Sequence, residues 1–78
     1  MMTQSRTITV EGVPFTATMW VDLFDSTVDV EATAYVQSQH LHYPGSTLVP
    51  VEVDIYTVPM DGWEDAFVKA AMAAISAA

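Results

Sequence analysis

Two histidines in a His-x-His pattern, His40 and His42, are the residues of this chain best suited to metal chemistry. On a strand this spacing turns both imidazole rings to one face, where they could ligate zinc. A third ligand is missing, because strand alternation places the carboxylates of Glu52 and Asp54 on the opposite face. The pattern therefore indicates a structural role near a loop for both histidines, with no metal and no cofactor.

Three hydroxyl side chains lie close to these histidines in the sequence and could act as nucleophiles, namely Ser38, Ser46 and Thr47. Nucleophilic catalysis also requires a base and an orienting acid, and the sequence has neither a nucleophile elbow nor a glycine-rich phosphate loop. A chain of 78 residues offers little room for a substrate pocket. We therefore expect a protein that is not an enzyme.

Carboxylates are the third chemically capable group, and they dominate the charge of the chain. Ten acidic residues stand against two basic ones, Arg6 and Lys69, which gives a formal net charge of -8. Contacts with phosphate groups need cations, so direct binding to DNA, RNA or an anionic membrane is not expected. The composition favours a basic protein surface as the partner.

Length and composition predict one small domain, residues 1–78. Hydrophobic residues make up 51% of the chain, which is enough for a folded core, and the absence of cysteine excludes disulfides and thiolate metal sites. No stretch approaches the roughly eighteen apolar residues of a membrane helix, and the first residues form no apolar run. We expect a globular cytoplasmic protein.

The elements that must position the acidic side chains are indicated by periodicity. Residues 27–36 alternate between small apolar and polar or acidic side chains, which is the pattern of a half-buried strand. The same alternation predicts strands over residues 7–10, 15–22 and 49–58. Each strand then has one apolar face and one polar face.

The C-terminal segment predicts a helix that runs to about Ala77. Asp61 is expected to cap this helix, with Glu64 as the capping-box partner three residues later. An apolar stripe at spacings of three and four would face the sheet, and it consists of Trp63, Phe67, Ala70, Ala71 and Ala74. A wider apolar arc, which leaves room for an interface, adds Val68, Met72 and Ile75.

Together these elements predict an α+β fold, a four-stranded antiparallel meander in the order 1-2-3-4 with one C-terminal helix packed on one face. In every hairpin an inward residue must pair with another inward residue. The expected inward pairs are Val10 with Phe15, Val21 with Val28 and Ala34 with Ile55, across loops at residues 11–14, 23–26 and 43–46.

The same pairing predicts the neighbours on the outer face: Trp20 beside Asp29, Tyr35 opposite Asp54 and Gln37 opposite Glu52. Carboxylates two residues apart on one strand lie about 6.5 Å apart, which is close to the spacing of phosphates along a nucleic-acid strand. Two interpretations stay open. These residues are either ordinary solvated strand positions, or the rigid aromatic area and acidic steering groups of a protein interface.

Leu23 and Phe24 lie in the second expected loop, where large apolar residues are unusual. The favoured interpretation is that they fold back onto the end of the core. In the other interpretation they form an exposed anchor for a partner, flanked by Asp22 and Asp25.

The functional hypothesis is a small acidic, non-enzymatic module that inhibits a partner protein by docking on its basic, nucleic-acid-binding surface. Its expected contact residues are Trp20, Asp22, Phe24, Asp29, Glu31, Tyr35, Glu52, Asp54 and Tyr56. In size and charge the chain resembles the small inhibitors that phages use against CRISPR or restriction nucleases, a likeness of composition without a shared residue motif. The alternatives are a structural, self-assembling subunit of phage or cytosolic type, and an antitoxin-like regulator of one enzyme.

Overall fold

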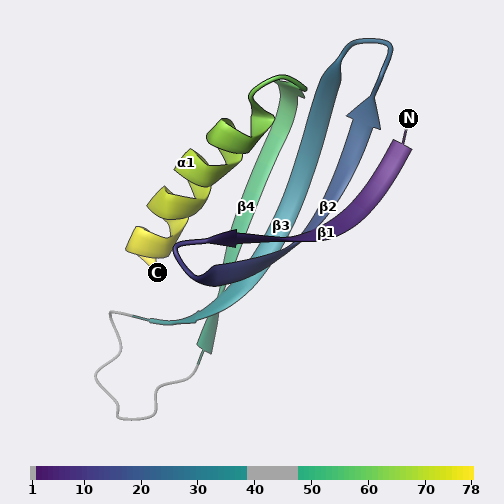
Figure 1. Ribbon diagram of the computed structural model, residues 1–78. Helices are drawn as coiled ribbons and strands as arrows, with labels where there is room; N and C mark the ends of the chain where they lie inside the picture. Colours follow the sequence, from purple (N-terminus) through teal and green to yellow (C-terminus); the bar gives the residue numbers. More distant parts are fainter. Residues whose placement is uncertain (1, 39–47) are drawn as a thin grey trace.

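The computed structural model describes residues 2–38 and 48–78, which form one antiparallel sheet and one helix (Figure 1). The elements are β1 (Met2–Val10), β2 (Val13–Asp22), β3 (Thr27–Gln37), β4 (Leu48–Pro59) and α1 (Trp63–Ala77). The strand order in the sheet is β1-β2-β3-β4. The predicted α+β meander with a C-terminal helix is therefore confirmed.

Alternation along the strands sorts the side chains onto an inner face, which α1 covers, and an outer face. Every buried residue in the described part of the chain is apolar. This core consists of Val10, Phe15, Ala17, Met19, Val21, Val28, Val30, Ala32, Ala34, Val51, Val53, Trp63, Phe67 and Ala71. Small alanines on both the sheet and the helix let the two layers approach closely.

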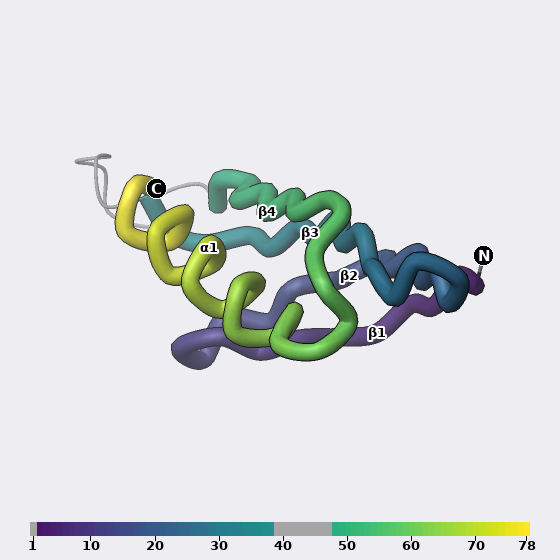
Figure 2. Tube along the Cα trace, turned by 90° about the horizontal axis from the view of Figure 1, so that it is seen from above, coloured from purple at the N-terminus to yellow at the C-terminus, as the bar shows by residue number. Residues whose placement is uncertain are grey.

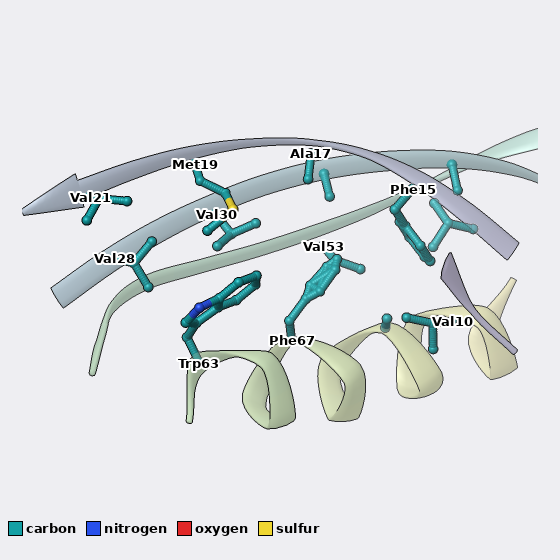
Figure 3. Close-up of a cluster of buried hydrophobic side chains, with 14 residues drawn as sticks. Val10, Phe15, Ala17, Met19, Val21, Val28, Val30, Val53, Trp63 and Phe67 are labelled. Carbon is teal, nitrogen blue, oxygen red and sulfur yellow. The ribbon is translucent and has the colours of Figure 1, made fainter. Parts of the chain in front are cut away.

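Two aromatic residues on α1 anchor the helix to the sheet. The rings of Phe67 and Phe15 meet edge to face, with centroids 5.7 Å apart and planes at 86°. Figure 3 shows Trp63 and Phe67 pointing from the helix into the cluster of valines on the inner face. The apolar stripe predicted for the helix is confirmed, because Trp63, Phe67 and Ala71 are its buried residues.

The start of α1 differs from the prediction. Gly62, not Asp61, is the N-cap residue, and no side chain caps the helix by a hydrogen bond. Gly62 adopts a left-handed conformation with φ 91°, which glycine enters without steric strain. The turn before it is tied to the β2–β3 loop instead, because the backbone N–H of Met60 donates to the carbonyl oxygen of Ser26 at 2.9 Å.

The β1–β2 turn is tighter than predicted. Glu11 and Gly12 both have positive φ, 51° and 78°, as a two-residue type I′ turn requires. Val10 therefore pairs with Val13, and the predicted pairing of Val10 with Phe15 is wrong. The shift is by an even number of residues, so the inner face keeps its apolar side chains.

The β3–β4 pairing also differs from the prediction, whereas the pairing of Val21 with Val28 is confirmed. Ala34 pairs with Val51 and not with Ile55, a shift of four residues along β4. Because four is an even number, the side chains of β4 up to Ile55 keep their predicted faces while their cross-strand neighbours change. Beyond Ile55 the shift is three residues, so Val58 pairs with Val28 and packs against the core. The loop predicted at residues 43–46 lies outside the described residues.

The molecule is elongated, with extents of 50 × 19 × 17 Å. The sheet twists strongly, so that β1 and β4 at its two edges run in clearly different directions (Figure 1). Within the described residues, α1 with its 15 residues falls short of the length and apolar character that a membrane crossing requires.

Candidate functional site

The outer face of the sheet is the part of the molecule where charge and open surface coincide. α1 packs on the other face, and no described element covers this one (Figures 1 and 2). Its side chains come from alternate positions of the four strands, as the sequence predicted. Carboxylates and hydroxyls dominate the middle of this face.

The observed register brings three carboxylates together. Glu31 on β3 pairs directly with Asp54 on β4, and Glu52 pairs with Thr33. They border a shallow hollow of about 330 Å³ that is lined by Thr16, Thr18, Glu31, Ala32, Thr33, Glu52 and Asp54. We call this surface the acidic hollow. Its lining offers negative charge and hydrogen-bonding oxygens.

The like charges of the acidic hollow are expected to reduce the stability of the isolated protein. Like charges directly opposite each other across two strands destabilise a sheet by a few tenths of a kcal/mol to about 1 kcal/mol. Glu31 and Asp54 occupy such a pair, and both are exposed. The threonine hydroxyls around them had no distinguishing signal in the sequence beyond strand parity.

Tyr56 fixes one side of the acidic hollow. Its hydroxyl donates a hydrogen bond of 2.6 Å to Oε2 of Glu31. This bond, with smaller contributions from desolvation and from the charges of Asp54, Glu31 and Asp29, raises the pKa of Tyr56 to about 12. A phenol is neutral at physiological pH in any case, and the bond to Glu31 keeps Tyr56 a hydrogen-bond donor to higher pH.

Asp29 has a structural role that the sequence did not reveal. Between Val28 and Val30 the β3–β4 pairing shifts by one residue, so that β4 carries a bulge opposite Asp29. Thr57 in this bulge has φ 55°, and its backbone N–H donates to Oδ1 of Asp29 at 2.6 Å. Oδ1 of Asp29 thus already accepts a hydrogen bond from within the protein.

The aromatic candidates occupy separate places on the outer face. Trp20 pairs with Asp29, as predicted, and is partly buried. Tyr35 lies opposite Pro50, so its predicted position opposite Asp54 is wrong. Gln37 likewise pairs with Leu48 and not with Glu52. The register shift therefore moves Tyr35 away from the acidic hollow.

The β2–β3 turn presents an exposed aromatic side chain. Oδ1 of Asp22 accepts hydrogen bonds from the backbone N–H groups of Phe24 and Asp25, at 3.0 and 3.1 Å. This Asx-type turn leaves Phe24 97% exposed and Leu23 62% exposed. The favoured prediction that these two residues fold back onto the core is therefore wrong.

A continuous strip of the outer face connects the acidic hollow to this turn. From Glu31, each step of two residues toward the start of β3 moves about 6.5 Å along the same face. The strip passes the pair of Trp20 and Asp29 and reaches Asp22, which pairs with Thr27 beside the turn. The structure thus brings most of the predicted contact residues onto one surface.

Within residues 2–38 and 48–78, no three His, Cys, Asp or Glu side chains are grouped closely enough to hold a metal ion. His40, His42, Ser46 and Thr47 lie outside the described residues. What the outer face offers chemically is the acceptance of hydrogen bonds from cationic donors by Glu31, Glu52 and Asp54.

Comparison of the chain with protein-family models, with curated proteins and with solved structures finds no match.

Proposed function

We propose that this chain is a small non-enzymatic protein-binding module whose acidic outer face inhibits a partner by occupying a basic, nucleic-acid-binding surface. The observation that supports this most directly is the opposed pair of Glu31 and Asp54 on a face without a covering helix. Such a pair costs stability in the free protein. A cationic partner surface would supply counter-charge to this pair and to Glu52.

The carboxylates would stand in for phosphate groups in the partner's site. Carboxylates accept charge-assisted hydrogen bonds from arginine and lysine, as phosphates do. Glu52 and Asp54 leave β4 on the same face, about 6.5 Å apart, which is similar to the spacing of successive phosphates. Hydroxyls of Thr16 and Thr18 in the acidic hollow add further acceptors for guanidinium N–H groups.

The rest of the strip would add contact area and orientation. Trp20 and Tyr56 provide rigid rings beside the carboxylates, and Phe24 provides an apolar anchor at the turn. Tyr35 belongs to the same face but lies beyond the acidic hollow. In this mode of action the protein would work in the manner of phage-borne anti-CRISPR or anti-restriction inhibitors. An antitoxin-like regulator would use the same acidic surface.

A charge-neutralising variant tests the proposal. Glu31→Gln, Glu52→Gln and Asp54→Asn together remove the charge of the acidic hollow with little change in side-chain shape. A matched control neutralises three exposed acids elsewhere, by Glu11→Gln, Asp61→Asn and Glu64→Gln. Wild type, variant and control are immobilised and exposed to the heparin-binding fraction of a cell lysate, with and without competing DNA.

The proposal expects wild type and control to capture the same nucleic-acid-binding protein at low salt, and expects DNA or high salt to displace it. The variant of the acidic hollow should lose this capture. Equal capture by all three proteins, or capture that DNA does not reduce, would contradict the proposal.

A further inference from the structure

The two edges of the sheet differ in how they are protected against pairing with another strand. The β4 edge carries Pro50 and Pro59, which have no N–H to donate, and the charges of Glu52 and Asp54. It also contains the bulge at Thr57, which interrupts the regular ladder. Each of these features discourages a further strand from pairing with β4.

The β1 edge has none of these features. Its nine residues, Met2–Val10, include no proline and no acid, and all nine pair with β2 in unbroken register. The burial pattern of β1 shows that residues 2–7 are exposed, although Arg6 contacts Trp63 at the start of α1 on the inner face. A regular row of backbone N–H and C=O groups is therefore open along β1.

The charge distribution indicates what can pair there. All ten acids of the chain lie outside β1, whose one charged side chain is Arg6. β3 lies two strands from β1, so the β3 carboxylates of two copies joined at β1 would be about 24 Å apart. That distance is about three Debye lengths at physiological salt, so the repulsion between the β3 carboxylates is screened. The acids Glu64 and Asp65 at the start of α1 lie nearer to β1, because Trp63 contacts Arg6.

We propose that β1 pairs antiparallel with β1 of a second copy about a two-fold axis at Ser5, which joins the two sheets into one. This register places Met2 beside Ile8 of the second copy, and Gln4 beside Arg6 of the second copy. Both pairs are favourable, one apolar and one polar. A two-fold axis at Arg6 would instead oppose two guanidinium groups.

The surroundings of Arg6 agree with this register. Its guanidinium lies over the ring of Trp63, 5.4 Å from the centroid, on the inner face. The amide oxygen of Gln4 of the second copy would reach the same guanidinium. On the outer face the register pairs hydroxyls only, Ser5 with Ser5 and Thr3 with Thr7. The side chains of β1 therefore complement those of β1 in the second copy.

The dimer has a defined geometry. Because the two-fold axis stands perpendicular to the sheet, both helices lie on one side and both outer faces lie on the other. The two copies would present two acidic hollows in the same direction. The inference does not depend on the proposed function, since it rests on the edges of the sheet and not on the acidic hollow.

Mass measured against concentration tests the pairing. Light scattering or sedimentation equilibrium of the wild-type protein should show a mass that rises from 8.5 kDa to twice that value. Ser5→Asp places two carboxylates across the axis and should abolish the dimer at concentrations where wild type is dimeric. Ala73→Asp adds the same charge at an exposed position on α1 and should leave the dimer intact.

A cross-link tests the register. The chain has no cysteine, so Ser5→Cys introduces one thiol, which should form a disulfide-linked dimer under mild oxidation. Thr9→Cys is the control, because in this register two copies of residue 9 are about 27 Å apart. A wild-type mass of 8.5 kDa at every concentration, or equal dimer in wild type and Ser5→Asp, would overturn the inference.

Discussion

The inner and outer faces of this sheet come from the same strands but have opposite chemistry. The inner face holds only apolar buried side chains and is covered by α1. The outer face carries Glu31, Glu52 and Asp54 close together, with no described element above them. The inner face therefore stabilises the fold through apolar burial, and the like charges on the outer face are expected to reduce that stability.

The largest effect is expected on the inner face. Phe67→Ala removes a fully buried ring that packs against Phe15, and it should lower the free energy of unfolding by about 3–5 kcal/mol. Phe24→Ala removes the same ring from a 97% exposed position and should change it by less than about 0.5 kcal/mol. Urea unfolding followed by tryptophan fluorescence measures both. Equal losses would contradict the assignment of the two faces.

A smaller loss is expected where an outer-face acid supports the backbone. Asp29→Ala removes the acceptor of the Thr57 N–H in the β4 bulge and should cost about 1 kcal/mol. Asp29→Asn keeps an oxygen at the same place and should retain most of the stability. If both variants lose stability equally, the charge of Asp29 matters more than its hydrogen bond.

Neutralising a charge of the acidic hollow should raise the free energy of unfolding, whereas the two changes above lower it. Asp54→Asn removes the like-charge pair with Glu31 and should raise the free energy of unfolding by about 0.5 kcal/mol. The gain should shrink at high salt, because salt screens the repulsion. Glu11→Gln, at the β1–β2 turn, is the control and should give a smaller change. A loss of stability in Asp54→Asn would show that the pair is not repulsive.

The most subtle expectation concerns the phenol of Tyr56. Its pKa is raised from 10.0 to about 12, so the stability that the neutral phenol provides is complete below pH 10 and is lost as pH rises toward 12. Absorbance titration in a Tyr35→Phe, Tyr43→Phe background follows this single phenol. Adding Glu31→Gln should lower the pKa of Tyr56, whereas adding Glu52→Gln should not, because Glu52 does not contribute to the shift. An unchanged pKa in Glu31→Gln would contradict the hydrogen bond.

Strand parity explains why so much of the fold could be predicted. Alternation assigns each side chain to a face, and the predicted and observed pairings differ by even numbers of residues except beyond the β4 bulge, where Val58 pairs with Val28 and packs against the core. The pairing of Val21 with Val28 was also predictable, because the four-residue loop between the strands is short. β1 was predicted too short, since Met2–Arg6 shows no apolar alternation and is a strand through its pairing with β2.

The grouping within the candidate site was less accessible from sequence. Strand alternation placed Glu31, Glu52 and Asp54 on one face. Their proximity depends on the β3–β4 register, which the long connection between these two strands does not determine. The β4 bulge, whose Thr57 N–H binds Asp29, has no clear signal in the sequence, because threonine does not favour positive φ. The exposure of Phe24 had one available signal, since Asp22 two residues earlier is well suited to an Asx turn.

The elongated shape also governs how this protein moves through solution. A particle of 50 × 19 × 17 Å experiences more hydrodynamic friction than a sphere of equal mass, so an 8.5 kDa monomer should elute early from a gel-filtration column. Pairing two such rods side by side along β1 broadens the particle more than it lengthens it, and friction per unit mass then falls. Elution volume would thus separate monomer from dimer poorly, whereas rotational diffusion, through the orientation dependence of amide relaxation, would separate them well.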